Sequence, residues 1–287
     1  MEKFKIFIQL TRLNKPIGFM LLFWPCAWGL TLAYYYNLDT KLYTKHLLLF
    51  FLGSILMRSA GCIFNDIVDR DLDKKVKRTK NRPIASNKIT ILNAFIYVVI
   101  LCIAALFILL QFNWLTIILG MSSMLLAFSY PFMKRITYWP QLFLGLTFNW
   151  GIIMGWTSIT NDISAPPIIL YIAAIFWTLA YDTIYGTQDI KDDEIIGNKS
   201  TSIKFKNNVN FFVSICYGVF VSLILYLCFM IKIDKTIIML SIFVILTLIY
   251  QIKIFKADKP ESCLRAFKIN NLTGMFLYIY ILSFSIL

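Results

Sequence analysis

The sequence is poor in the residues that most metal and nucleophile sites require. Its 287 residues include a single histidine, His46, and none of its six cysteines forms a Cys-x-x-Cys pair. A histidine-based zinc site or a Ser-His-Asp triad is therefore close to excluded. Acidic residues are also scarce, with 15 against 28 basic residues. Any chemistry that needs carboxylates must draw on this small set.

Apolar residues, in contrast, make up 59% of the chain, and the mean hydropathy is +0.72. This composition is typical of a polytopic membrane protein. The net charge of +13 would suggest a nucleic-acid partner for a soluble protein, but basic residues in a membrane protein first serve to flank its spans. We therefore expect a membrane-lipid environment and no nucleic-acid partner, and we infer no obligatory protein partner.

Nine apolar stretches are long enough to cross a bilayer, which takes about 20 residues of helix. The expected spans are residues 16–36, 46–67, 90–110, 114–130, 139–159, 166–187, 210–231, 234–252 and 269–287. The sequence thus predicts an all-α fold with about nine transmembrane helices, in a single domain over residues 1–287.

The distribution of basic residues sets the expected orientation of these spans. With the N-terminus in the cytoplasm, 23 of the 28 Lys and Arg residues fall in cytoplasmic segments, 4 fall on the other face, and Arg58 lies within a span. Positive residues collect on the cytoplasmic side of membrane proteins. The first residues match neither a cleaved signal peptide nor an Arg- and Ser-rich transit peptide. We therefore expect a bacterial inner membrane, with a mitochondrial inner membrane as the less favoured location.

Nine of the 15 acidic residues form two clusters, both at the cytoplasmic ends of even-numbered spans. The clusters are Asp66, Asp69, Asp71 and Asp73, and Asp182, Asp189, Asp192, Asp193 and Glu194. Their common offset of 116 positions suggests a duplicated unit, roughly residues 1–131 and 132–287. A single acidic loop is most often solvated charge or helix capping, but two matched clusters favour a shared role.

Helical spacing places three carboxylates of each cluster on one face. Residues 66, 69 and 73 are spaced i, i+3, i+7, and residues 182, 189 and 193 are spaced i, i+7, i+11, whereas Asp71 and Asp192 point elsewhere. Opposed carboxylates need a cation between them, and oxygen ligands without histidine or thiolate favour Mg2+. Because Mg2+ usually shares its carboxylates with substrate phosphates, the pattern predicts a diphosphate ligand. Arg78 and Arg82 are the expected contacts of its oxygens.

Four stretches resemble the UbiA superfamily of intramembrane aromatic prenyltransferases. "RSAGCIFNDIVDRDLDKKVKRTKNRP" is similar to the first aspartate motif of that family, NDxxDxxxD, and "YDTIYGTQDIKDDEIIGNKST" is similar to the second. The likeness extends to "TRLNKPIGFMLLFWPCAWGL" and "YPFMKRITYWPQLFLGLTFNWGIIMGW", and together the four cover roughly a third of the chain. The branch that prenylates 4-hydroxybenzoate is the most similar.

This resemblance implies transfer of a polyprenyl group from polyprenyl diphosphate to the ring carbon ortho to the hydroxyl of 4-hydroxybenzoate, a membrane step of ubiquinone biosynthesis. It implies a helix bundle around a central cavity open to the cytoplasmic side, with Mg2+ as the cofactor. The residues that it implies for the metal are Asp66, Asp69, Asp73, Asp182, Asp189 and Asp193. Those implied for the diphosphate are Asn65, Arg12, Arg78, Arg82 and Lys134. Arg135 is implied for the carboxylate of the acceptor.

Further candidates follow from the chemistry of prenyl transfer, which needs a dry chamber with aromatic faces. Residues that we expect near the chamber are Tyr130, Tyr181, Tyr185, Phe128, Phe148, Trp150 and Trp156, although any one aromatic is more often simple packing. Asn149 is predicted to bind substrate, because a buried amide in an apolar run usually faces the interior of a bundle. Tyr185, one of these aromatic residues, is also predicted to bind substrate. Asp182, the deepest carboxylate, is predicted to accept the ring proton or to orient the acceptor.

Two alternatives stay open at this point. Another prenyltransferase of the same superfamily, acting on protoheme or dihydroxynaphthoate, would share both aspartate motifs. A cation-coupled transporter would also carry intramembrane acids and repeated halves, but its ionisable residues are expected near the bilayer midplane. The DxxDGxxAR pattern of phosphatidyltransferases is absent.

Overall fold

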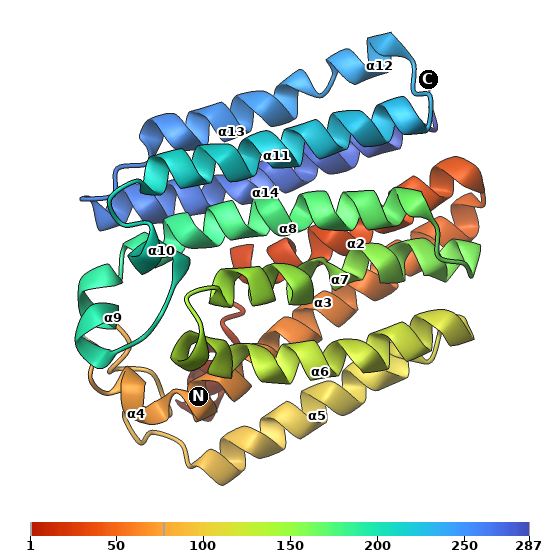
Figure 1. The fold of residues 1–287 in the computed structure, drawn as a ribbon. Helices are drawn as coiled ribbons and strands as arrows, with labels where there is room; N and C mark the ends of the chain where they lie inside the picture. Colours follow the sequence, from red (N-terminus) through yellow and green to blue (C-terminus); the bar gives the residue numbers. More distant parts are fainter. Residues whose placement is uncertain (1, 77, 287) are drawn as a thin grey trace.

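The structure, a computed structural model, describes residues 2–76 and 78–286. Within these ranges every regular element is a helix, and the long helices run side by side in one bundle (Figure 1). The long helices are α2 (Ile17–Tyr36), α3 (Thr40–Val68), α5 (Ile91–Leu109), α6 (Trp114–Ile136), α7 (Pro140–Thr160), α8 (Ala165–Thr187), α11 (Val209–Met230), α13 (Ile242–Ile254) and α14 (Pro260–Ser283). The shorter ones are α1 (Glu2–Thr11), α4 (Arg70–Asp73), α9 (Ile190–Ile196), α10 (Thr201–Lys204) and α12 (Lys235–Met239).

Eight segments of the described chain are long and apolar enough to cross a membrane, with α12 and α13 counted together. α14 has the length but is less apolar, because Asn270, Asn271 and Thr273 lie along it. Two of these polar side chains have hydrogen-bond partners inside the bundle. The indole N–H of Trp24 donates to Asn271 Oδ1 at 2.9 Å, and Gln251 Nε2 donates to Thr273 Oγ1 at 3.0 Å. α14 therefore fits as the ninth crossing segment that the sequence predicts.

Several predicted boundaries are wrong by more than a helical turn. α3 begins at Thr40 rather than residue 46, because the carboxylate of Asp39 caps it by accepting a hydrogen bond from Leu42 N at 2.9 Å. α6 continues through Pro131 to Ile136 instead of ending at residue 130. The last helix begins at Pro260 rather than residue 269, and the predicted eighth span is split into α12 and α13. Hydropathy misses charged helix ends because they extend beyond the apolar core of the bilayer.

The bundle is held together at its centre by direct contact between α2 and α7. A Cβ atom added at Gly29 would lie 2.0 Å from the carbonyl oxygen of Ile152, and one added at Gly155 would lie 2.4 Å from that of Cys26. Small residues let helix backbones approach this closely, as at many membrane-helix interfaces. This contact separates α3, α5 and α6 on one side from α11, α13 and α14 on the other.

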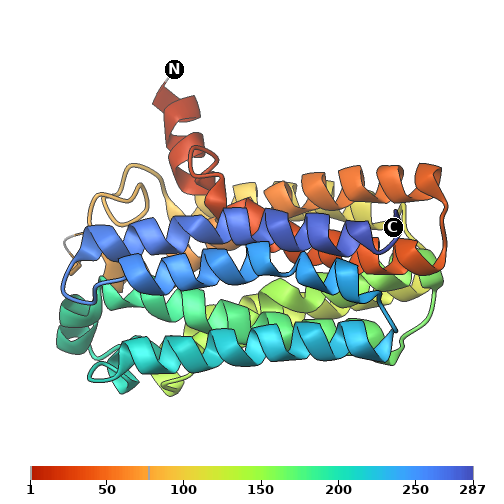
Figure 2. The same ribbon diagram turned by 90° about the horizontal axis from the view of Figure 1, so that it is seen from above.

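The short helices α4, α9 and α10 lie together at one end of the bundle, which we call the cap end (Figure 1). It comprises residues 69–76, 78–88 and 188–208, which follow α3 and α8. α1 projects from the side of the bundle and packs mainly on α3 (Figure 2). Both aspartate clusters are therefore carried to the same end of the molecule.

We expect the Gly155→Ala substitution to lower the free energy of unfolding by about 1–3 kcal/mol, because the added methyl must push apart two helix backbones. The measurement is the thermal unfolding midpoint in detergent. Gly218→Ala, on α11, is the matched control, since a Cβ atom there meets nothing within 4 Å. An unchanged midpoint for Gly155→Ala would contradict the close α2–α7 contact.

Candidate active site

A cavity of about 1350 Å³ lies among α2, α3, α5, α6 and α7 and reaches the cap end. All six carboxylates assigned to a metal from the sequence line it: Asp66, Asp69, Asp73, Asp182, Asp189 and Asp193. They come from two segments more than 100 residues apart in the chain. The structure thus brings both clusters to one cavity.

The first set is placed by the end of α3 and the turn into α4. α3 stops at Val68, Asp69 joins the two helices, and Asp73 ends α4, so the expected i, i+3, i+7 face survives the break. Asp66, Asp69 and Asp73 are buried, whereas the side chain of Asp71 is 84% exposed and pairs with Lys74. Asp71 was not predicted to bind the metal, and its position at the surface is consistent with that.

The second set follows the same plan at the end of α8. Asp182 lies within α8, Asp189 precedes α9, and Asp193 lies on α9. Asn198 Nδ2 donates to Asp193 Oδ1 at 2.9 Å. Burial raises the pKa of the Asp193 carboxyl above its ordinary value, and this hydrogen bond opposes the shift. A cation near Asp193 would therefore favour its charged form.

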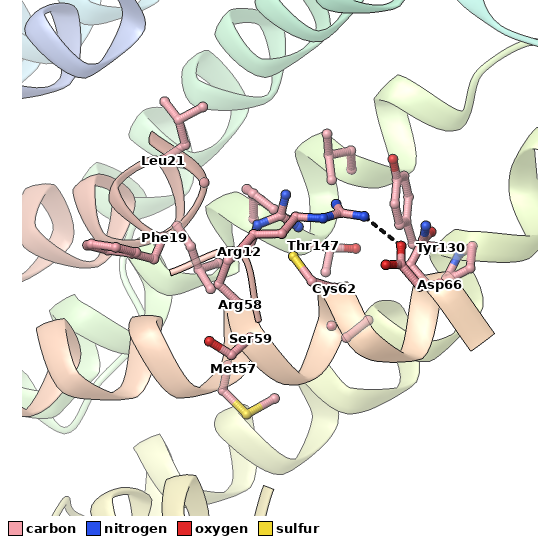
Figure 3. A pocket seen from close by; sticks show the side chains of 18 of the residues that line it. Arg12, Phe19, Leu21, Met57, Arg58, Ser59, Cys62, Asp66, Tyr130 and Thr147 are labelled. Atoms are coloured by element: carbon pink, nitrogen blue, oxygen red, sulfur yellow. Dashed lines mark hydrogen bonds and ion pairs between the residues drawn. The ribbon is translucent and has the colours of Figure 1, made fainter. Parts of the chain in front are cut away.

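Four basic side chains neutralise most of these carboxylates. Arg12 Nη2 lies 2.5 Å from Asp66 Oδ1 (Figure 3), and Arg82 Nη1 lies 3.0 Å from the same oxygen and 2.8 Å from Asp73 Oδ2. Lys134, on the last turn of α6, donates to Asp69. Arg12 has a φ of 55°, a left-handed conformation that favours glycine. This strained backbone turns the guanidinium toward the carboxylates.

Arg78 connects the segment that follows the first cluster to the second cluster. Its Nε and Nη2 donate to the two oxygens of Asp189 at 2.9 and 2.7 Å, and its Nη1 donates to Tyr185 Oη at 3.2 Å. The guanidinium also lies 5.7 Å from the centre of the Tyr185 ring. Because Arg78 follows the first cluster in the chain and Asp189 belongs to the second, this bidentate pair bridges the cap end. Asn65 Nδ2 donates to Asp69 Oδ2 at 3.0 Å and completes the group.

The chemistry of the donors fits Mg2+, although the chain does not form a closed cage for it. In the described residues, no three His, Cys, Asp or Glu side chains gather closely enough to hold a metal ion by themselves. Mg2+ usually takes one or two carboxylates together with water and substrate phosphates, so a closed cage is not required. Asp69 Oδ1 is buried and accepts no hydrogen bond. Such an oxygen is a suitable ligand for a hard cation.

Two residues predicted from the sequence do not line the cavity. Arg135 points out of the end of α6, where its Nη2 donates to the carbonyl of Val68 at 2.9 Å and lies 3.6 Å from Asp69 Oδ1. Asn149 is fully buried between α7 and α8, where its Nδ2 donates to Gly145 O at 2.8 Å and Ala174 O at 3.1 Å. Neither side chain lines the cavity, and Asn149 joins two helices. The roles of both residues toward substrate stay predictions.

The aromatic candidates divide in a similar way. Those that line the cavity are Phe128, Tyr130, Phe148, Trp150, Tyr181 and Tyr185. Trp156 does not, because it packs in the main core, with its ring 5.3 Å from that of Tyr36. Asp182, Tyr130 and Tyr181 line the same cavity, so it combines a carboxylate with aromatic walls.

Arg58 is the main site residue that the sequence analysis missed. It lies on α3, lines the same cavity as Asp66 and Tyr130 (Figure 3), and its guanidinium is 5.3 Å from the centre of the Phe148 ring. Its Nε is buried and has no hydrogen-bond partner. A Cβ atom at Gly18 would lie 3.0 Å from this nitrogen, so the glycine leaves room for the guanidinium. A lone arginine within an apolar span indicates a functional role. From the sequence, Arg58 entered only the count of basic residues.

Comparisons with known proteins identify the family of the chain. Residues 22–279 match the model of the UbiA prenyltransferase family. A protein of Caenorhabditis elegans named 4-hydroxybenzoate polyprenyltransferase, mitochondrial, is 49% identical over 201 residues, which cover 70% of this chain and 56% of the relative. The chain spans about half the length of the curated relatives it matches.

Two solved structures share the fold. A UbiA homologue from Aeropyrum pernix K1 superimposes with a TM-score of 0.77 at 19% identity, over 92% of this chain and 97% of that one. A UbiA homologue from Archaeoglobus fulgidus bound to GPP and Mg2+ gives 0.74 at 18% identity, over 98% and 100%. Because the family match covers most of the chain, the chain belongs to the UbiA prenyltransferase family.

Proposed function

We propose that the chain transfers a polyprenyl group from polyprenyl diphosphate to the ring carbon ortho to the hydroxyl of 4-hydroxybenzoate, a membrane step of ubiquinone biosynthesis. One observation carries the proposal. Two aspartate sets and their bases line one cavity, and the rest of its lining is mainly aromatic and apolar. The name of the C. elegans relative supports this acceptor, and the GPP and Mg2+ bound to the A. fulgidus homologue support this donor and metal.

The diphosphate of the donor would lie at the cap end. Asp66, Asp69 and Asp73 would face Asp182, Asp189 and Asp193 across it, with Asn65 beside the first set. Mg2+, when bound there, would supply positive charge to the departing diphosphate. Arg12, Arg78, Arg82 and Lys134 lie within reach of the same carboxylates, and their charges would hold the phosphate oxygens. Stabilising the charge of the leaving group favours cleavage of the allylic carbon–oxygen bond.

The acceptor would lie deeper, next to Arg58 and Asp182. We assign its carboxylate to Arg58, whose buried Nε is free to donate, and Phe148 supplies an aromatic face against the guanidinium. The ring carbon ortho to the hydroxyl would take the prenyl carbon, with Tyr130 and Tyr181 stabilising positive charge on the allylic group. Asp182, close enough to Arg58 to interact with its charge, would accept the ring proton.

The membrane that holds the chain is part of the proposal. Its eight apolar segments and α14 make it a multi-span membrane protein. We propose that the cap end faces the side where 23 of the 28 basic residues lie. The relatives that the chain matches are named mitochondrial, so a mitochondrial inner membrane stands beside a bacterial one as its proposed location.

The direct test supplies membranes containing the chain with 4-hydroxybenzoate, a polyprenyl diphosphate and Mg2+, and measures the 3-polyprenyl product. We expect Asp69→Ala and Asp189→Ala each to lower the rate by at least about 100-fold, because each removes charge stabilisation around the leaving group. Asp71→Ala is the control and keeps most of the activity, since that carboxylate is exposed. Normal rates in both motif variants would remove the proposed site.

The assignment of Arg58 predicts a selective defect. Arg58→Met should raise the KM for 4-hydroxybenzoate by about 10- to 100-fold, the loss expected for one charge-assisted hydrogen bond, and should leave the KM for the donor near that of the parent chain. Arg135→Met is the matched control, with the KM for the acceptor unchanged. If Arg135→Met alone raised the KM for 4-hydroxybenzoate, the carboxylate of the acceptor would be assigned to Arg135 instead.

A further inference from the structure

The last long helix, α14, also reaches the cavity, although the aspartates and bases of the site come from other segments. Leu264 and Phe267, on the first turns of α14, both line the cavity. Figure 1 shows α14 starting at the end of the bundle where α9 and α10 lie, and α14 packs against α8. The side chain of Phe267 is therefore placed next to the part of α8 that leads into the second aspartate set.

The ring of Phe267 contacts two tyrosines of α8. Its centre lies 5.8 Å from that of the Tyr181 ring and 4.6 Å from that of the Tyr185 ring. Aromatic rings attract each other at separations of about 4.5–7 Å. Because Tyr181 and Tyr185 are spaced i, i+4, they lie one turn apart on the same face of α8. A single ring from α14 thus packs on both.

The two tyrosines belong to different parts of the site. Tyr185 lies at the cap end, where its hydroxyl accepts a hydrogen bond from Arg78 Nη1 at 3.2 Å. Tyr181 is buried deeper, where its ring is 4.8 Å from that of Trp177 and forms part of the cavity wall. Phe267 therefore contacts both the end where we place the diphosphate and the chamber where we place the acceptor.

Burial alone does not fix the orientation of Arg78. Its side chain is 43% exposed, and a long exposed side chain samples many rotamers unless contacts hold it. Those contacts are the bidentate pair with Asp189 and the hydroxyl and ring of Tyr185. Tyr185 is itself only half-buried, and its ring packs on Phe267. The orientation of Arg78 thus depends indirectly on a ring from α14.

We propose that Phe267 is a positioning residue for prenyl transfer. Its ring holds Tyr185 where the hydroxyl meets Arg78, and it holds Tyr181 in the wall of the chamber. Phe267 has no polar group of its own, so it acts through these two tyrosines. The inference rests on the proposed function in placing the diphosphate at Arg78 and Asp189, but it does not depend on the identity of the acceptor.

The first test measures the kinetics of Phe267→Ala in lipid nanodiscs, with geranyl diphosphate as the donor. We expect the KM for the donor to rise about three- to tenfold and kcat to fall by a similar factor, because the aromatic contacts are lost. The KM for 4-hydroxybenzoate should stay within about twofold, and Phe267→Tyr, which keeps the ring, should behave like the parent chain.

Phe276→Ala is the matched control for this substitution. Phe276 lies on the same helix, is also half-buried and has its ring 6.0 Å from that of Phe243, but it does not line the cavity. It should leave both constants for the donor within about twofold. Unchanged kinetics in Phe267→Ala, or an equal defect in Phe276→Ala, would overturn the proposal.

A double substitution separates positioning from simple packing. Tyr185→Phe removes only the hydroxyl that Arg78 contacts, and it should raise the KM for the donor in the parent chain. In Phe267→Ala the same change should add less than about twofold, because the hydroxyl is no longer held at Arg78. If the two effects multiply, Phe267 acts independently of Tyr185, and the positioning role is wrong.

A binding measurement distinguishes this inference from the proposed function. Calorimetry with geranyl thiolodiphosphate and Mg2+ needs no acceptor, and Phe267→Ala should weaken binding by about three- to tenfold. Phe267→Leu, which keeps apolar volume without the ring, should show the same defect with the unfolding midpoint of the parent chain. A parent chain that binds this analogue but forms no 3-polyprenyl product would contradict the proposed function alone. A productive parent chain whose Phe267→Ala and Phe267→Leu variants bind the analogue equally tightly would contradict the positioning role alone.

Discussion

The structure depends on the compensation of carboxylate charge at the edge of a bilayer. A buried carboxylate without a partner costs several kcal/mol. Six carboxylates line one cavity here, and three of them, Asp66, Asp69 and Asp73, are buried. The chain brings bases to four of the six from α1, the α4–α5 loop and the end of α6, through Arg12, Arg78, Arg82 and Lys134. These pairs fix the cap end around the site, and Arg78 ties the segment after the first aspartate set to Asp189 of the second. The same bases are positioned to bind phosphate oxygens.

Charge then decreases along the cavity in an order that matches an amphiphilic donor. Aspartates and bases occupy the cap end, Arg58 and Asp182 lie deeper among aromatic rings, and the far end is apolar as far as Phe112. The close packing of α2 on α7 through glycines brings these two helices together at the centre of the bundle, whereas α5 and α6 have little contact with each other.

Local patterns were sufficient to predict the spans, the family and the six cavity carboxylates, because hydropathy and helical spacing depend on near neighbours in the chain. The contrast between buried Asp69 and exposed Asp71 follows from spacing alone. Arg58 was passed over, and the packing of Arg135 and Asn149 was not foreseen, because both depend on which face of a helix meets which neighbour, and this is set by tertiary packing. Helix ends such as Pro260 were missed because charged first turns carry no hydropathy signal. The duplication of residues 1–131 and 132–287 stays a proposal, supported by the matching positions of the two aspartate sets.

The central claim is that the two aspartate sets hold one metal–diphosphate group between them. The most direct measurement is the position of Mn2+, located by its anomalous scattering in crystals grown with a prenyl thiolodiphosphate that cannot ionise readily. The account predicts Mn2+ against carboxylates of both sets, with a single diphosphate between them. Metal and diphosphate held by one set alone, with the other set still paired to its bases, would contradict it.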